Sequence, residues 1–366
     1  GEYLGIITRF DGRLRLKSNV SVYPYDGSGH GAKELQYRFQ WTAPIVISPH
    51  DTKTVYHAGN VLFRTRDRGQ NWDAISPDLT RNDTTRQQKS GGLTTEDVSP
   101  TYASVLFAIT ESPIVPGLIW TGSNDGLVQV TRDNGASWTD VTGNIPDLPE
   151  WGTVSNVEPS RFNPAVAYIT VDFHQLGHND PYVYRTDDYG ASWHSIADDV
   201  PRSVFSYAHV IREDPTRAGM LYLGTENSVY VSFDDGERWL PLQGDLPHAP
   251  AYWLTVQSHF NDLVVGTYGR GFWILDDITA IQQMTDEVMA SAVHLFEPRP
   301  AYRFMPREGA NSQPGDPAAG QNPASGASIN FYVSSPPEGP VRVEILTEDG
   351  DLVQQLPLRG VRAGLN

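Results

Sequence analysis

The sequence predicts an all-β fold: a β-propeller of four-stranded blades, followed by a partial immunoglobulin-like β-sandwich. Three observations predict it. An eight-residue pattern occurs four times, a β-rich run precedes each copy, and turn-forming glycine and proline supply 33 and 27 of the 366 residues. Many short strands joined by turns are typical of all-β domains, and this composition is poorly suited to long helices.

The repeated pattern is (S/T)-x-D-x-G-x-x-W, called the box below, and its copies begin at residues 65, 131, 186 and 232. Its Asp can accept hydrogen bonds from N–H groups of its own turn. Its Gly can take a positive φ. Its Trp starts the next strand, and we expect the ring to pack back over the turn. We therefore assign a structural role to the following residues. They are Thr65, Asp67, Gly69, Trp72, Thr131, Asp133, Gly135, Trp138, Thr186, Asp188, Gly190, Trp193, Ser232, Asp234, Gly236 and Trp239.

Four short strands are predicted around each box. A fifth blade follows, and its box has degenerated to Asp276-Asp277-Ile278. Residues 3–22 are predicted to be the last hairpin of an earlier blade. A propeller closes its ring to remove open sheet edges. Five blades and a hairpin leave such edges, so we expect N-terminal blades to be missing or to come from another chain.

The predicted domain boundaries follow composition. Residues 1–304 form the propeller, and residues 279–292 within it are predicted as a short helix or an extended closing segment. Residues 305–328 are rich in Pro, Gly, Ala, Asn and Gln and are predicted to be a flexible linker. Residues 329–366 alternate like the first strands of an immunoglobulin-like domain, which we expect to continue beyond them.

Charge and composition exclude several function classes. The absence of cysteine excludes disulfides, thiolate catalysis and cysteine-based zinc sites. A formal net charge of -17 disfavours nucleic acid as a partner. No apolar run reaches the length of about 18 residues that a membrane-spanning helix needs. We predict no cofactor, and we expect a protein or a glycan as the ligand.

The boxes resemble the BNR-repeat superfamily, which includes sialidases, xyloglucanase-type hydrolases and sortilin-type propellers. The segments that carry the resemblance are residues 39–49, 76–82, 122–126, 230–236 and 267–277. The resemblance covers roughly residues 1–304, and it is greatest to the large bacterial proteins labelled glycosyl hydrolase or sortilin-like. The resemblance implies an extracytoplasmic location, either periplasmic or secreted.

Two functions stay open at the level of sequence. The first is a non-catalytic module that binds protein or glycan, alone or as a subunit of a larger assembly. The alternative is a xyloglucanase-like glycoside hydrolase, which needs two carboxylates facing each other across a groove. Candidate carboxylates are Asp125, Asp172 and Glu226, which lie between the second and third strands of their blades. Turn chemistry is the plainer interpretation of all three.

Large rings and an arginine stand near the starts of the innermost strands. Such platforms suit sugar rings or peptide side chains, although packing between blades also uses large rings. The predicted binding residues are Arg38, Trp41, Tyr102, Trp151, Tyr207 and Trp253. His174 and His178 with Asp172 form the densest polar cluster. A solvated loop is the stronger interpretation there, so no metal site is predicted.

Overall fold

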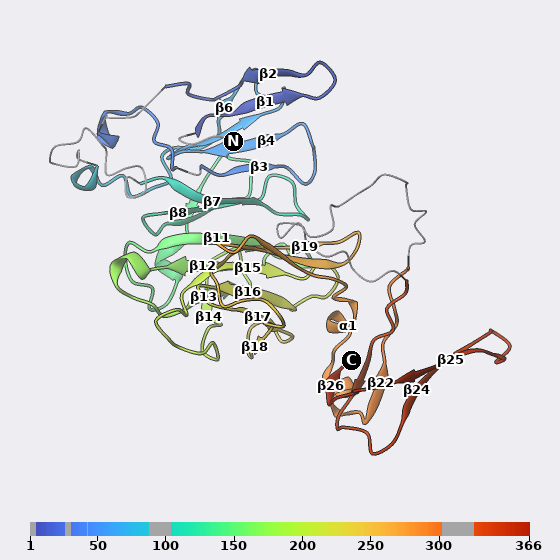
Figure 1. Cartoon of the computed structure of the whole chain (residues 1–366). Helices are drawn as coiled ribbons and strands as arrows, with labels where there is room; N and C mark the ends of the chain where they lie inside the picture. The colour runs from blue at the N-terminus through green and yellow to red at the C-terminus, as the bar shows by residue number, and fades with distance from the viewer. Residues whose placement is uncertain (1–4, 26–30, 42, 88–103, 302–325) are drawn as a thin grey trace. The chain divides into compact units, whose positions relative to one another are not determined.

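The computed structural model describes residues 5–25, 31–41, 43–87, 104–301 and 326–366. The chain forms two compact units, which are described separately (Figure 1). The first unit comprises residues 1–255 and 265–273, and the second comprises residues 256–264 and 274–366.

Four four-stranded antiparallel sheets make up most of the first unit. The first sheet contains β3 (Ile45–Ile47), β4 (Val55–Ala58), β5 (Leu62–Thr65) and β6 (Asp73–Ala74). The second contains β7 (Leu106–Glu111), β8 (Ile119–Ser123), β9 (Val128–Thr131) and β10 (Thr139–Asp140). The third contains β11 (Thr153–Pro159), β12 (Ala167–Asp172), β13 (Tyr182–Thr186) and β14 (His194–Ser195). The fourth contains β15 (Ala208–Glu213), β16 (Leu221–Thr225), β17 (Val229–Ser232) and β18 (Leu240–Pro241).

A fifth sheet contains only three strands, β19 (Ala251–Gln257), β20 (Asp262–Thr267) and β21 (Phe272–Leu275). The box is absent from this sheet, in agreement with the degenerate sequence after β21. The prediction of successive four-stranded antiparallel sheets is confirmed. The arrangement is consistent with part of a β-propeller.

The hairpin of β1 (Thr8–Asp11) and β2 (Leu16–Asn19) has the register of an outer blade hairpin. Val20 N donates to Ile7 O at 2.9 Å, just as Ile75 N donates to Leu62 O at 2.9 Å after the outermost strand of the first sheet. The two strands therefore correspond to the third and fourth strands of a blade, as predicted for this segment.

Each box closes its turn with the predicted hydrogen bonds. In the second box, Thr131 Oγ1 donates to Asp133 Oδ1 at 2.8 Å, and the N–H of Gly135 donates to Thr131 Oγ1 at 2.9 Å. Ser137 N donates to Asp133 Oδ1 at 2.8 Å. Gly135 has φ +90°, in the left-handed region where glycine is favoured. The same Thr or Ser to Asp contact recurs at 2.9, 2.9 and 2.8 Å in the other boxes.

The tryptophan of the box reaches the neighbouring sheet, which corrects the expectation that it packs over its own turn. Trp138 Nε1 donates to Ile75 O at 3.0 Å, beyond the outermost strand of the preceding sheet. Trp72 and Trp239 do the same at 2.8 and 2.7 Å. A Cβ on Gly135 would lie 2.4 Å from Ile75 O, so the glycine also permits the close approach. The box therefore joins consecutive sheets.

The box carboxylates predict a stability that falls at acid pH. Hydrogen bonds from Ser137 and Thr131 lower the pKa of Asp133 from 3.8 to about 2. Because the folded pKa lies below the unfolded one, this stabilisation is present above pH 3.8 and is lost as pH falls towards 2. We expect the melting temperature of Asp133→Asn to fall less than that of the wild type between about pH 4 and pH 2. If the melting temperatures of the wild type and of Asp133→Asn fell equally with pH in thermal unfolding, this assignment would be contradicted.

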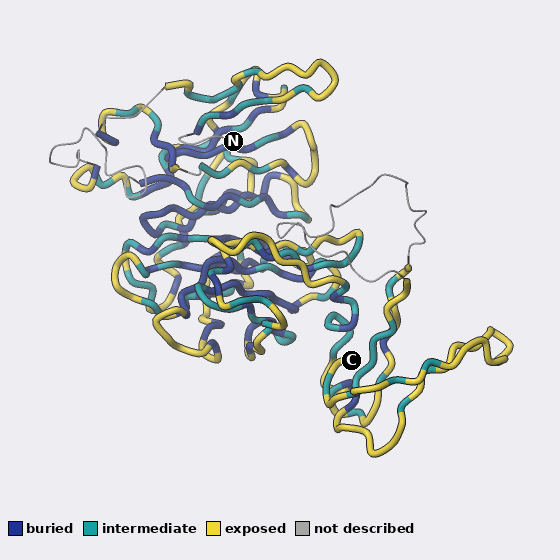
Figure 2. The backbone as a smooth tube through the Cα atoms, in the orientation of Figure 1, coloured by how far each residue is buried: buried dark blue, intermediate teal, exposed yellow. Residues whose placement is uncertain are grey.

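The middle sheets of the first unit are buried on both faces (Figure 2). Every residue of β8 and β16 is buried. Side-chain hydroxyls join neighbouring sheets. Thr110 Oγ1 of β7 donates to Val157 O of β11 at 2.8 Å, and Thr170 Oγ1 of β12 donates to His209 O of β15 at 3.2 Å. This packing fixes the positions of the innermost strands relative to one another.

The second unit contains α1 (Thr279–Gln282) and α2 (Asp286–Ala290), so residues 279–292 take the helical of the two predicted forms, as two short helices. Its strands form two small sheets: β22 (Val293–Leu295), β23 (Phe331–Val333) and β26 (Gly364–Leu365) in one, β24 (Val341–Leu346) and β25 (Leu352–Leu358) in the other. The β24–β25 hairpin is largely exposed (Figure 2).

The immunoglobulin-like arrangement and the domain boundaries stay predictions, and residues 305–325 of the predicted linker lie outside the described residues. Within the described chain, no helix is both long enough and apolar enough to cross a membrane.

Candidate functional site

A cavity of about 740 Å³ is lined largely by residues on or beside the first strand of each of the five sheets. These strands, β3, β7, β11, β15 and β19, are called the innermost strands. Three of these strands, β7, β11 and β15, each carry one unpaired extra residue, a β-bulge. The extra residues are Phe107, Ser155 and His209, and all three line the cavity. A bulge changes the direction in which a side chain points. The repeated irregularity therefore builds the cavity wall.

Asp172 and His174 form a pair at the cavity. Asp172 ends β12, and His174 begins the short helix η6 (His174–Leu176) that follows. His174 Nδ1 lies 2.7 Å from both carboxylate oxygens of Asp172, and the His174 N–H donates to Oδ1 at 2.9 Å. The imidazole of His174 stacks on the ring of Tyr207, with 4.7 Å between centroids.

A second histidine–carboxylate pair lies on the fourth sheet. His209 Nε2 is 2.8 Å from Glu226 Oε2. The His209 ring stacks on Tyr252 at 4.2 Å and meets the edge of Tyr207 at 5.3 Å. The rings of His174, Tyr207 and His209 therefore form a continuous ladder between Asp172 and Glu226, and Tyr252 extends it beyond His209.

Electrostatics favour an ionised Glu226. Burial raises the pKa of this carboxyl, but hydrogen bonds from His209 and Tyr207 outweigh burial and leave the pKa lowered. Burial and the hydrogen bond to Glu226 raise the pKa of Tyr207, so this phenol stays protonated at neutral pH.

A buried charged pair lies further along the cavity wall. Arg212 Nη1 donates to Asn156 Oδ1 at 2.8 Å and to Glu158 Oε2 at 3.1 Å, and Nε donates to Leu254 O at 3.0 Å. Its guanidinium lies 4.4 Å from the centre of the Trp253 ring. Burial raises the pKa of Glu158 and lowers that of Arg212. Trp253 is 54% exposed and lines the cavity, as its predicted binding role requires.

Asp125 lies apart from the other two carboxylates. It is buried, and its oxygens accept hydrogen bonds from Ser123 Oγ at 2.5 Å and from Arg81 N at 2.9 Å. One oxygen closes the turn with Ser123 and the other holds the backbone of Arg81, so the structure favours a structural role for Asp125. Asp172 and Glu226 are brought to one cluster.

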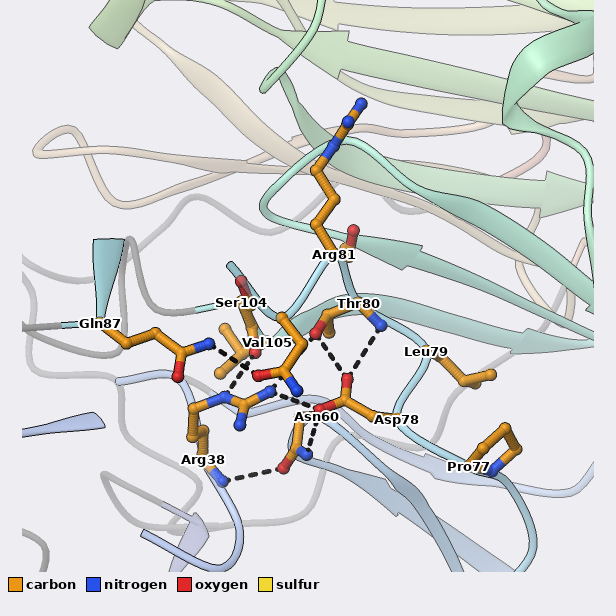
Figure 3. A network of polar contacts seen from close by, with 12 residues as sticks. Arg38, Asn60, Pro77, Asp78, Leu79, Thr80, Arg81, Gln87, Ser104 and Val105 are labelled. Carbon is orange, nitrogen blue, oxygen red and sulfur yellow. Dashed lines mark hydrogen bonds and ion pairs between the residues drawn. The ribbon is translucent and has the colours of Figure 1, made fainter. Parts of the chain in front are cut away.

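Arg38 is held in a buried polar network (Figure 3). Its guanidinium lies 2.6 Å from Asp78 Oδ2 and donates to Ser104 O at 3.1 Å. Asn60 Nδ2 donates to the same Asp78 oxygen at 2.8 Å. The side chain of Arg38 is only 6% exposed. The geometry therefore favours a structural role for Arg38 over the predicted binding role.

The other predicted binding residues are scattered. Trp41 is exposed but does not line the cavity. Trp151 is covered by the guanidinium groups of Arg81 and Arg86, at 5.4 and 3.8 Å from its ring centre. Tyr207 is buried within the ladder. Tyr102 lies outside the described residues.

The weak metal candidates have different surroundings. His174 is paired with Asp172, whereas the ring of His178 lies beside Phe173 at 6.3 Å. Within the part of the chain that the structure describes, no three His, Cys, Asp or Glu side chains are placed to hold a metal ion.

Sequence reasoning missed His209 and Asn156. His209 is the bulge residue of β15, and Asn156 directly follows the bulge of β11. No turn residue or charge pattern in the sequence indicates these bulges. An alignment of the innermost strands would have given His209 the same position as Phe107 and so indicated that it lines the cavity.

Comparisons with known proteins show the fold alone. No protein-family profile matches the chain. A probable oligoxyloglucan-reducing end-specific xyloglucanase of Neosartorya fischeri is 30% identical over 141 residues, which are 37% of this chain and 17% of that protein. The GH74 xyloglucanase of Xanthomonas campestris has 18% identity and a TM-score of 0.52, over 76% of this chain and 42% of that one.

YCF48 of Cyanidioschyzon merolae has 18% identity and a TM-score of 0.33, over 46% of this chain and 52% of that one. The chain thus spans less than half the length of either xyloglucanase, and its fold is similar to that of a xyloglucanase propeller.

Proposed function

We propose that this chain is part of a glycoside hydrolase that binds a neutral polysaccharide in the cavity and cleaves it with Asp172 and Glu226. One observation carries the proposal: Asp172 lines the cavity, and a row of rings joins it to Glu226, which lies behind the cavity residue His209, beside exposed aromatic side chains of the cavity. The partial similarity to xyloglucanases supports xyloglucan as the substrate class.

The chemistry assigns different roles to the two carboxyl groups. Glycoside hydrolysis needs an acid that protonates the leaving oxygen and a carboxylate that activates water or attacks the sugar. Glu226 has a lowered pKa and takes the ionised role. The acid role falls to the Asp172–His174 pair, because His174 Nδ1 lies 2.7 Å from the Asp172 carboxylate and the two groups can share a proton. Tyr252 and Trp253 offer ring faces against which a sugar ring can stack.

Product release from a polysaccharide panel tests this proposal. We expect Asp172→Asn and Glu226→Gln each to lower the rate of xyloglucan cleavage by about 10²- to 10⁴-fold, the usual contribution of a positioned acid or base. Asp180→Asn is the matched control, because Asp180 is exposed, forms a surface ion pair with Arg202 at 3.1 Å and does not line the cavity. Cleavage that persists in both variants would overturn the assignment.

Binding without cleavage is the second candidate. It is favoured by the fact that each carboxylate already has a histidine partner at 2.7 or 2.8 Å. A module of this kind would retain oligosaccharides in equilibrium binding measurements without releasing product. Protein ligands and a role as a subunit of an assembly belong to this candidate, and co-purification from the native source tests them.

We also propose an extracytoplasmic location, an immunoglobulin-like fold that begins in residues 329–366, and a sortilin-type relationship. The repeated boxes and the alternation of residues 329–345 support these proposals. Cell fractionation tests the location, and an experimental structure tests the rest.

A further inference from the structure

We propose that Asn156 is a specificity-determining residue of the cavity, whose side-chain amide donates a hydrogen bond to an oxygen atom of a neutral glycan. The inference rests on the proposed function, because it takes a glycan as the occupant of the cavity. It adds the chemical group that the ligand must present at this point: a hydroxyl or ether oxygen.

The orientation of the Asn156 amide is fixed by two donors. Asn156 is 3% exposed and lines the cavity directly after the bulge of β11. Its Oδ1 accepts from Arg212 Nη1 at 2.8 Å and from Ile211 N at 3.1 Å. A flipped amide would place its NH₂ group against two other donors, so this orientation is determined by the contacts.

The amide nitrogen is then left without a protein acceptor. Among the described residues, none accepts a hydrogen bond from Asn156 Nδ2. Buried polar groups are nearly always hydrogen bonded, so an amide donor that faces a cavity needs an oxygen from water or ligand. A polar ligand that brings such an oxygen satisfies the donor when it displaces the water.

Sheet packing alone does not require a polar residue at this place. Asn156 follows the bulge of β11, and the residues that follow the bulges of β7 and β15 are Ala108 and Val210. The third sheet is therefore the only one of these three with a side-chain donor there. Because the donor NH₂ repels another donor, the position favours a sugar oxygen over a protonated amine.

The test is Asn156→Asp. Aspartate has the same shape and keeps an acceptor for Ile211 N and Arg212, but it has no N–H to donate. We expect the affinity for xyloglucan and cello-oligosaccharides to fall about five- to tenfold in calorimetric titrations, the scale of one lost hydrogen bond. We expect the affinity for glucosamine oligomers to rise. Circular dichroism checks that the variant keeps the wild-type fold.

Asn163→Asp is the matched control, because it makes the same chemical change between β11 and β12 of the same sheet, at an exposed residue that does not line the cavity. An equal loss in both variants would assign the effect to added charge and overturn the inference. Unchanged binding by Asn156→Asp would also overturn it and would leave the proposed function standing. A wild-type protein that binds no neutral oligosaccharide would overturn both.

Discussion

Replacing Trp239 by alanine is expected to destabilise the first unit by about 3–5 kcal/mol, the usual loss for a buried aromatic side chain. Trp239 is 3% exposed and packs in one core cluster with Ile196 and Tyr168 of the preceding sheet. Its indole N–H also donates to Ile196 O at 2.7 Å. The substitution therefore removes ring packing and leaves a carbonyl without its donor. Urea unfolding followed by circular dichroism measures the loss.

Phenylalanine variants separate the hydrogen bond from the packing. Trp239→Phe keeps most of the ring and loses the N–H, so we expect it to lower the free energy of unfolding by about 1–2 kcal/mol. Trp193 occupies the same box position and is 6% exposed, but its Nε1 has no hydrogen-bond partner among the described residues. Trp193→Phe should therefore cost less than Trp239→Phe. Equal losses would show that the indole hydrogen bond contributes nothing.

The boxes could be predicted from sequence because their contacts are local. Thr131, Asp133 and Ser137 meet within one turn, so the residue pattern itself specifies the hydrogen bonds. The direction of Trp138 could not be predicted in the same way. Its acceptor, Ile75 O, belongs to the preceding sheet and lies far away in the sequence.

The candidate site depends on contacts between sheets, and sequence spacing does not encode them. Asp172 and Glu226 were candidates, but only the ladder of His174, Tyr207 and His209 relates them. Near the start of an innermost strand, a residue can face the cavity or be buried between sheets. The sequence does not distinguish these two outcomes, since the partner strand decides between them.

Loss of the charge on Arg212 is expected to expose a pH dependence that the wild type largely hides. Arg212→Met removes the partner of a buried carboxylate, Glu158, at 3.1 Å. Breaking one side of a buried ion pair typically costs about 3–5 kcal/mol. Arg212→Met/Glu158→Gln removes the stranded charge as well and should recover most of that loss. Chemical unfolding of the wild type, both single variants and the double variant measures the coupling.

The sign of the pH effect follows from Glu158. Burial raises its pKa above 4.5 in the folded chain, so the native state holds this proton more tightly than the unfolded state. The contribution of Glu158 to stability is therefore fully present below pH 4.5 and is lost as pH rises through the raised pKa. Without Arg212 the carboxylate loses its main counter-charge, and the fall becomes steeper. We expect Arg212→Met to cost much less at pH 4 than at pH 8, whereas the double variant shows little difference. A loss of the same size at both pH values would mean that Arg212 acts through packing on Trp253 and not through its charge.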